Sequence, residues 1–336
     1  MGITIKFKST YILSTSTVGG KKEKEGRFGS YYDKTYDSLF AKEKNYEDAE
    51  KRMTLDATNI ALKKAKLNKS DIDLLIGGDL LNQITNTTKV AETFSSSFIG
   101  TYGACATSIL SLGIGSIFVS NKLVNKVLIY TSSNYGSVER QFRYPTSYGI
   151  KKKDTTTLTV SGSASLILTN EKTQVKVVSL TLGKSIDSKT YDASDMGSIM
   201  ARAAYDTLLT HITNMNKNIE DYDYILTGDL GVIGLAVFKD MLSLDNYYID
   251  NIFDAGAMIF DLKKANSFSG GSGPACLPLV AFSYVYNKLI HNEIKSVLLI
   301  ATGALHSKTS VAQKNNVPVI AHAIELKKEM KKSWII

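Results

Sequence analysis

An internal duplication is the feature of this sequence that most constrains its fold. Residues 71–80 read "DIDLLIGGDL" and residues 221–230 read "DYDYILTGDL". Five positions are identical at a constant offset of 150 residues, and in the first copy they are Asp71, Asp73, Gly78, Asp79 and Leu80. Self-similarity at a fixed spacing indicates that one structural unit is used twice. We therefore predict two related halves, at residues 1–172 and 173–336.

The segments around the two copies follow the same order. Apolar residues at three- and four-residue spacing predict a helix before each copy, over residues 46–67 and 196–215. After each copy come a turn of small residues ("YGACATS", "SGGSGPA"), an apolar helix and an apolar strand ("KVLIYTSS", "SVLLIATG"). Such strands are typical of sheets covered on both faces, and the helix after Cys105 is apolar nearly all round. We predict an α/β five-layer α-β-α-β-α sandwich, in which two sheets share central helices.

Composition excludes several classes of protein. A chain of 336 residues with 43% hydrophobic and 21% charged residues can bury a large core. Its two cysteines and four histidines show no C-x-x-C or H-E-x-x-H spacing, so we expect neither a disulfide framework nor a metal site. The N-terminus lacks the apolar core of a signal peptide, and no apolar run approaches about 20 residues. We expect neither export by that route nor a membrane-spanning helix.

The net charge of +8 favours anionic partners without choosing among them. Lysines cluster near turns or termini, at residues 21–25, 151–153 and 327–332. We expect these clusters to be solvated faces, with contact to an acidic membrane surface as the alternative. No basic stripe with interleaved aromatic residues accompanies them, so we expect no nucleic acid partner.

Cys105 stands at the start of the first apolar helix, in "GTYGACATS". The N–H groups and positive dipole end of a helix N-terminus stabilise a thiolate or a bound anion. Gly103 and Ala104 permit a tight turn there, and Thr107 follows in the first turn of the helix. Free cysteines are also often buried and inert. Three roles are open: a residue of a ligand site, an inert core thiol, or a catalytic nucleophile.

Longer motifs point to a known family. They include "GGKKEKEGRFGSYYDKTYD", "GDLLNQ", "ERQFRYPTSYG", "DMGSIMARAAYDT", "GGSGPAC", "ATGALHS" and "IAHAIEL". With these motifs the chain resembles the thiolase fold of thiolases and ketoacyl synthases. More narrowly, it resembles the stage V sporulation protein AD family of spore-forming bacteria, from residue 19 to about residue 325.

The resemblance implies a protein without cofactor or catalysis that binds dipicolinic acid, a pyridine dicarboxylate, with or without calcium. It also implies that the protein works with membrane proteins of the same spore operon. Together they move this compound into the developing spore and out again at germination. The implied location is peripheral, at the inner spore membrane, and the implied assembly is a homodimer.

A dicarboxylate needs paired donors and a flat apolar slot. Arg140 and Arg143 are spaced i, i+3 beside Phe142, so their guanidinium groups are candidates for gripping carboxylates. The alternative is that they hold a loop or a dimer interface. Asn82 is an uncharged donor near the first repeated turn. We expect Cys105 and Thr107 at the same ligand site.

Several second-half residues are further candidates. Asp195 and Met196 open a helix, where Asp195 is a ligand residue or simply an N-cap. Asp79 and Asp229 either bind calcium or cap the following loop, and we favour capping because both copies keep the aspartate. His306 and His322 follow or end strands near the expected pocket, as ligand or structural residues. We expect His211 and His291 on helix surfaces.

The alternative function is an acyltransferase or condensing enzyme that uses Cys105 with a thioester. In thiolase-fold enzymes the matching cysteine accepts the acyl group, helped by histidine and asparagine residues of the second half. The sequence has "TGDLG" and "GGSGPAC" at those places, with neither residue. A nucleophile without base and oxyanion donors loses most of its rate advantage, so we expect no catalysis. A third reading is a scaffold that docks membrane partners and binds nothing small.

Overall fold

Two five-stranded sheets with the same strand order carry the two halves. The computed structural model describes residues 2–142, 152–192, 194–248 and 250–329. The first sheet has the order β5 (Ser97–Gly100), β4 (Leu74–Gly78), β6 (Lys126–Ser133), β8 (Gly162–Thr169) and β2 (Tyr11–Gly19). The second has the order β12 (Ile252–Asp254), β11 (Tyr224–Gly228), β14 (Ser296–Ala304), β15 (Pro318–Lys328) and β9 (Val175–Leu182). In both sheets the fourth strand runs antiparallel to its neighbours and the first three are parallel, so the duplication extends to topology.

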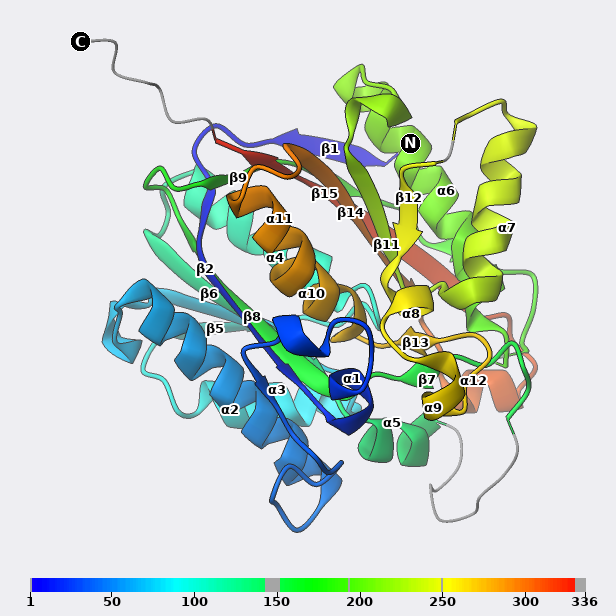
Figure 1. The fold of residues 1–336 in the computed structure, drawn as a ribbon, viewed down its shortest axis with the longest axis horizontal. Coiled ribbons are helices and arrows are strands. Elements are labelled where there is room, and N and C mark those ends of the chain that lie inside the picture. Colours follow the sequence, from blue (N-terminus) through cyan, green and yellow to red (C-terminus); the bar gives the residue numbers. More distant parts are fainter. Residues whose placement is uncertain (1, 143–151, 193, 249, 330–336) are drawn as a thin grey trace.

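The two apolar helices predicted after the small-residue turns lie between the sheets (Figure 1). They are α4 (Thr107–Ser120) and a second helix made of α10 (Cys276–Val280), a π-helical segment (Ala281–Val285) and α11 (Tyr286–Ile290). Helix α4 contacts strands of both sheets. A Cβ at Gly113 would lie 2.5 Å from Leu180 in the second sheet, and one at Gly115 would lie 2.9 Å from Ile129 in the first. The two glycines therefore let α4 pack closely against both sheets at once.

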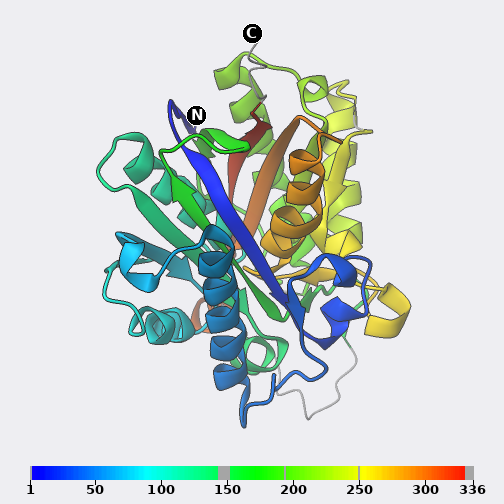
Figure 2. The same cartoon turned by 60° about the vertical axis from the view of Figure 1, so that its left-hand side comes forward.

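Longer amphipathic helices cover the outer faces. Helices α2 (Tyr46–Ala65) and α3 (Thr85–Ala91) cover the first sheet, and α6 (Met196–Met215) with α7 (Gly231–Leu244) covers the second (Figures 1 and 2). The predicted helices at 46–67 and 196–215 thus agree with α2 and α6 within two residues. The five layers of the predicted sandwich are confirmed.

The two halves interlock. The boundary that we place after residue 172 lies in the turn between β8 and β9, and it stays a prediction. β2 pairs with β9 at Tyr11 and Ile12, which joins the two sheets. β1 (Ile3–Lys6), at the N-terminus, pairs with β9 and so extends the second sheet. β7 (Leu158–Thr159) pairs with β13 (Gly271–Ser272) across the halves. One hydrophobic core accordingly includes buried side chains from both halves, among them Leu112, Ile129, Leu168, Leu277, Leu299 and Ile324.

The repeated aspartates explain why the duplicated motif begins with Asp-x-Asp. The Asp71 carboxylate accepts a hydrogen bond from the Asn68 N–H (2.7 Å), and Asp221 accepts one from the Asn218 N–H (2.8 Å), each closing a 3-10 turn. The second aspartate of each motif accepts two backbone N–H groups at the start of the neighbouring strand, at distances of 2.7 to 2.9 Å. Each motif therefore fixes the turn that connects the preceding helix to its strand, and ties that turn to the neighbouring strand.

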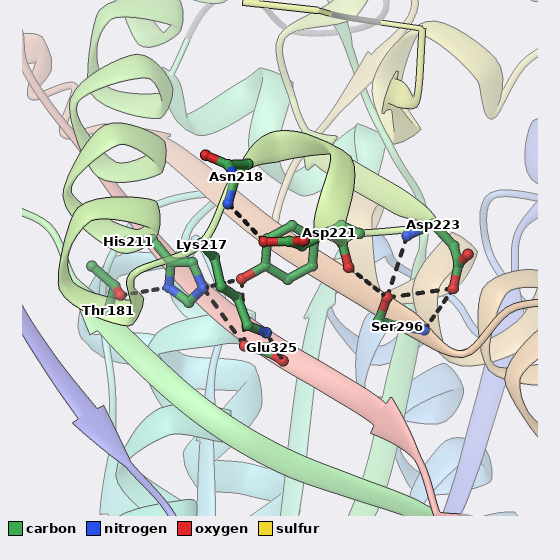
Figure 3. A network of polar contacts seen from close by, with 9 residues as sticks. Thr181, His211, Lys217, Asn218, Asp221, Asp223, Ser296 and Glu325 are labelled. Carbon is green, nitrogen blue, oxygen red and sulfur yellow. Dashed lines mark hydrogen bonds and ion pairs between the residues drawn. The ribbon is translucent and has the colours of Figure 1, made fainter.

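The expectation that His211 lies on a helix surface is wrong. Its side chain is fully buried between α6 and the second sheet (Figure 3). Nδ1 lies 2.7 Å from the Thr181 Oγ1 and Nε2 lies 2.8 Å from the Tyr222 hydroxyl. The Tyr222 hydroxyl donates to Glu325 (3.4 Å), which also accepts from the Lys217 ammonium (2.6 Å). The prediction from helical periodicity failed because a polar side chain can be buried when its hydrogen-bonding groups have partners. Both ring nitrogens of His211 have such partners on other elements.

The other two second-half histidines outside the pocket region differ in exposure. His291 is exposed at the end of α11, as expected, and its Nδ1 lies 2.9 Å from the Asn287 carbonyl oxygen. His322 is buried in β15, where Nδ1 accepts the Gly183 N–H at 3.3 Å. Burial lowers the pKa of His322 to about 4, so the side chain is neutral and structural.

Candidate functional site

The turn between β5 and α4 is held by threonines. The Thr107 hydroxyl donates to the Ala104 carbonyl oxygen (2.6 Å) and accepts the Gly103 N–H (3.0 Å). The Thr101 hydroxyl lies 2.7 Å from the Ser111 hydroxyl, which ties the turn to the second turn of the helix. Ala104 has a φ of 49°, a conformation that costs a residue with a side chain about 1 to 2 kcal/mol. These hydrogen bonds hold the strained turn and place Cys105 just before the N-terminus of α4.

Cys105 opens into a small cavity of about 40 Å³, which we call the inner cavity. Its thiol is half-buried, and neither cysteine of the chain is in a disulfide. Residues of both halves form the wall, and those of the first half include several from α5 (Tyr135–Phe142). The wall consists of Leu80, Tyr102, Ala104, Cys105, Val138, Glu139, Phe142, Thr159, Met196, Ser272, Gly273, Ala304 and His306.

A larger cavity of about 630 Å³, the outer cavity, adjoins the inner one. The two share Leu80, Tyr102, Phe142 and His306 as wall residues. The remaining wall of the outer cavity is mostly polar: Leu81, Asn82, Gln83, Ile84, Gly100, Thr101, Gln141, Leu305, Ser307, Lys308 and Thr309. A cavity of this size is typical of small-molecule sites. The Cys105 turn is thus the floor of a funnel that widens toward solvent.

Strained backbone marks the rim of the outer cavity. Gln83 has a φ of 58° and Ile84 a φ of 48°, and a β-branched residue rarely adopts this conformation. Gln141 of α5 holds the segment in place, because its Oε1 accepts the Asn82 N–H (3.1 Å) and its Nε2 donates to the Leu80 carbonyl oxygen (2.9 Å). Strain of this kind persists where the surrounding structure fixes it, often at ligand sites.

Tyr102 and His306 stand where the two cavities meet. Desolvation, with Cys105 and Asp79 nearby, raises the pKa of Tyr102 to about 12, so its hydroxyl stays protonated and can donate. His306 follows β14, and its ring centroid lies 5.7 Å from that of Phe142. The prediction that His306 lies near the pocket therefore agrees with its position in the wall.

Glu139 is a site residue that we did not single out from the sequence. Its carboxylate is buried in the wall of the inner cavity and forms an ion pair with the Lys152 ammonium (2.6 Å). It also accepts a hydrogen bond from the Thr159 hydroxyl at 3.3 Å. The motif "ERQFR" drew attention to its arginines, whereas the apolar face of α5, with Val138, carries the glutamate inward.

Several predicted ligand residues lie away from both cavity walls. Arg140 is exposed and pairs with Glu47 of α2, because it lies about 100° further around α5 than the buried Glu139. Thr107 is buried in the hydrogen bonds of the turn. Asp195 caps α6 by accepting the Ser198 N–H (3.2 Å), and only its neighbour Met196 reaches the inner cavity. Arg143 lies outside the described residues.

Of the two aspartates after the repeated strands, Asp79 caps the loop that follows it, as predicted, whereas Asp229 does not. Asp79 is buried and accepts the N–H of Leu81 and both the N–H and the hydroxyl of Thr87, at 2.6 to 2.7 Å. Asp229 is buried behind the Gly-rich turn and accepts the Gly273 N–H at 2.7 Å. Among the described residues, no three His, Cys, Asp or Glu side chains gather as a metal site.

The fold places the chain in the class of thiolase-like proteins. A solved structure of an OleA variant from Xanthomonas campestris superimposes with a TM-score of 0.62, covering 96% of this chain and 99% of that one at 14% identity. The 3-oxoacyl-[acyl-carrier-protein] synthase III of Aquifex aeolicus VF5 superimposes with a TM-score of 0.59, covering 95% and 99% at 12% identity. At these identities the likeness shows the fold alone.

Sequence comparison defines the family. The family model described as stage V sporulation protein AD matches residues 2–327, so the chain belongs to that family. Stage V sporulation protein AD of Bacillus subtilis (strain 168) is 40% identical over 314 residues, which cover 94% of this chain and 93% of that protein. The protein is therefore a sporulation protein with a thiolase-like fold. In the ranges that the structure describes, no helix combines the length and apolarity needed to cross a membrane.

Proposed function

We propose that this protein binds dipicolinic acid without chemical change, in the outer cavity, as its part in sporulation and germination. The observation that carries the proposal is the 630 Å³ cavity at the mouth of the Cys105 turn. Its wall combines two aromatic side chains with neutral donors and one lysine. Membership of the sporulation family supports the choice of ligand.

The wall chemistry suits a small planar dianion. Tyr102 and Phe142 offer faces for a pyridine ring, and stacked or edge-to-face aromatic pairs add about 0.5 to 1.5 kcal/mol beyond burial. Asn82, Lys308 and Thr309 offer donors for carboxylates. The one cationic side chain among the described residues of the two walls, Lys308, lines the outer cavity, while the inner cavity is apolar apart from Glu139 and a few neutral polar groups. The ligand therefore binds above Cys105 with its carboxylates toward the wider cavity.

Calorimetry with dipicolinate tests the proposal, with and without calcium. We expect Tyr102→Ala to weaken binding by about fivefold, because it removes a ring face, and stacking is worth about 1 kcal/mol. Lys308→Gln should weaken it severalfold, and the exposed Lys263→Gln on α9 (Leu262–Ala265) serves as the matched control. No binding by the natural protein, or equal binding by all variants, contradicts the proposal. Comparing the affinities measured with and without calcium shows whether the protein binds the free dianion or its calcium chelate.

Peripheral attachment to the inner spore membrane, through membrane proteins of the same operon, belongs to the same proposal.

We also propose that the protein forms a homodimer. β5 is the outermost strand of the first sheet and directly precedes the Cys105 turn, so it offers a pairing edge. Tyr102, 47% exposed, follows it. Light scattering on the purified protein should give twice the 36.8 kDa chain mass, and a monomer at high concentration contradicts the dimer.

Acyl transfer is the second candidate function, because the inner cavity brings a thiol, an imidazole and a carboxylate to one wall. In that case the Cys105 thiol attacks a thioester carbonyl, its proton passes to His306, and the leaving thiol takes the proton back. The structure offers His306 here rather than the histidine that we sought in the loop after β11. Incubation with acetyl coenzyme A and intact-mass analysis separates the candidates: acylation that Cys105→Ala abolishes supports an enzyme, and an unmodified mass supports binding alone.

A further inference from the structure

A third cavity shares no wall residue with the inner and outer cavities, and Cys105 is not part of its wall. It has a volume of about 80 Å³. The loop after α1 (Lys21–Lys24), strands β11 and β12, helix α8 (Ala255–Met258) and the π-helical segment enclose it; Figures 1 and 2 show this blue loop beside the orange and yellow elements. The wall consists of Arg27, Phe28, Tyr224, Leu226, Phe253, Met258, Val280, Tyr284 and Val285. We call it the aromatic cavity.

Aromatic rings form its sides. The ring centroids of Phe28 and Tyr284 lie 5.1 Å apart, and those of Tyr224 and Phe253 lie 4.9 Å apart, both pairs tilted. Tyr31, exposed outside, packs edge-on against Tyr284 at 5.1 Å. The floor is aliphatic and buried. Because the cavity is far smaller than the about 300 to 1,000 Å³ of pockets for drug-sized ligands, a guest larger than a single small ring is excluded.

Arg27 gives the rim its charge. Its guanidinium lies 5.8 Å above the Phe28 ring and is exposed. In the described part of the chain, no carboxylate lies within 4.0 Å of it. Lys288 lies 5.2 Å above the Tyr284 ring but is paired with Glu293. Arg27 therefore has both the charge and the planar donor face for one carboxylate, and these cations disfavour a cationic guest.

The duplication shows that the two tyrosine hydroxyl groups of this cavity have no counterpart in the first half. At an offset of 150 residues, Tyr224 corresponds to Leu74. Counted from the Asn-Lys-Leu shared by the two central helices, Tyr284 corresponds to Phe118. Burial, together with the neighbouring Tyr284 hydroxyl, raises the pKa of Tyr224. The first-half helix α4 is regular, whereas the second carries the π-helical segment that includes Tyr284; such segments often occur at functional sites.

We propose that the aromatic cavity binds a small aromatic monocarboxylate, with the ring between the Phe28–Tyr284 and Tyr224–Phe253 pairs and the carboxylate on Arg27. A monocarboxylate fits better than a dicarboxylate. A second carboxylate would face the buried apolar side chains of Leu226, Val280 and Val285, which cannot donate a hydrogen bond to it, and burying an unpaired charge is strongly unfavourable. The site is independent of the proposed dipicolinate site.

Fluorine NMR with 4-fluorobenzoate as the probe tests this assignment. We expect saturable broadening or shift of the probe signal with the natural protein. Arg27→Gln should weaken binding at least about tenfold, since hydrogen bonds to charged groups contribute about 1.5 to 3 kcal/mol. Arg202→Gln, at an exposed position of α6, is the matched control and should bind like the natural protein. Phe253→Leu, which keeps an apolar side chain, should also weaken binding.

Competition completes the test and separates it from the dipicolinate proposal. Unlabelled benzoate should displace the probe, whereas cyclohexanecarboxylate and dipicolinate should displace it poorly. Lys308→Gln, in the outer cavity, should leave probe binding unchanged. The proposal is overturned if the natural protein does not bind the probe, if Arg27→Gln binds as tightly as Arg202→Gln, or if Lys308→Gln weakens binding. Thermal melting of each variant verifies that it is folded.

Discussion

The small-residue turns before α4 and α10 occupy corresponding places in the two halves, but their cysteines have different surroundings. Cys105 is half-buried and lines the inner cavity, whereas Cys276 is fully buried. Burial, together with the Asp229 and Asp254 carboxyl groups, raises the pKa of the Cys276 thiol well above its usual range. The second turn contributes Ser272 and Gly273 to the cavity wall, but not Cys276. The two halves thus share the scaffold, and one of the two thiols lines a cavity.

The repeated aspartates show the same divergence. Asp79 caps the start of α3, in the segment that follows it directly, whereas Asp229 holds the more distant Gly-rich turn through Gly273. In the second half Asp254 takes over the loop, accepting the N–H groups of Leu230, Gly231 and Ala257. A shared motif therefore fixes strand ends in both halves while its last aspartate serves different loops.

The largest predicted difference between the halves concerns pH. In the first half, burial and the nearby Asp79 raise the pKa of Glu50 to about 8. The stability from its protonated form is full below its usual pKa of 4.5 and is lost as the pH rises toward 8. In the second half, burial lowers the pKa of His211 to about 3, so the stability from neutral His211 is full above 6.5 and is lost as the pH falls toward 3.

Single variants separate these opposite slopes. Glu50→Gln should flatten the loss of unfolding free energy between pH 5 and 8, and His211→Gln should flatten the loss below about pH 6.5, each by about 1.4 kcal/mol per pH unit at most. Urea unfolding across pH measures both. If both variants change the same limb of the profile, the assignment of opposite slopes to Glu50 and His211 fails.

The next largest difference concerns backbone strain in the two turns. Gly273 has a φ of 124°, and an added Cβ would lie 2.9 Å from the Ser133 hydroxyl oxygen. Gly273→Ala should therefore reduce the free energy of unfolding by about 2 to 3 kcal/mol. Ala104→Gly should change it by less than about 1 kcal/mol, because relief of strain offsets the larger entropy of the unfolded chain. Equal losses in urea unfolding would show that the two turns are equally constrained.

A smaller difference is expected when each thiol is replaced by a hydroxyl. Cys276→Ser buries a polar group in the core and should destabilise the fold by about 1 to 3 kcal/mol. Cys105→Ser borders a cavity and should cost no more than about 0.5 kcal/mol. Thermal denaturation compares the two directly. A larger loss at Cys105 would mean that its thiol belongs to the core.

The repeat and the apolar segments were sufficient to predict the layers, because both strand burial and helix periodicity leave local patterns. Strands β2 and β9 were not predicted, because both contain serine and threonine residues that interrupt an apolar pattern. In β2 the Ser14 and Ser16 hydroxyl groups are buried because they donate to backbone carbonyl oxygens of α2. Cys105, Asn82, Met196 and His306 were placed at the cavities by their positions at element ends. Glu139 was missed and His211 misplaced because their partners, Lys152 and Tyr222, are brought to them by tertiary structure.

Alkylation of the two cysteines tests the central claim most directly. The native protein is treated with iodoacetamide, with and without saturating dipicolinate, and the rate at each cysteine is followed by peptide mass spectrometry. We predict that Cys105 reacts, that Cys276 reacts at least about a hundredfold more slowly because its thiolate is suppressed by burial, and that dipicolinate slows Cys105 alone. Similar rates at both cysteines, or no effect of dipicolinate on Cys105, would contradict the account.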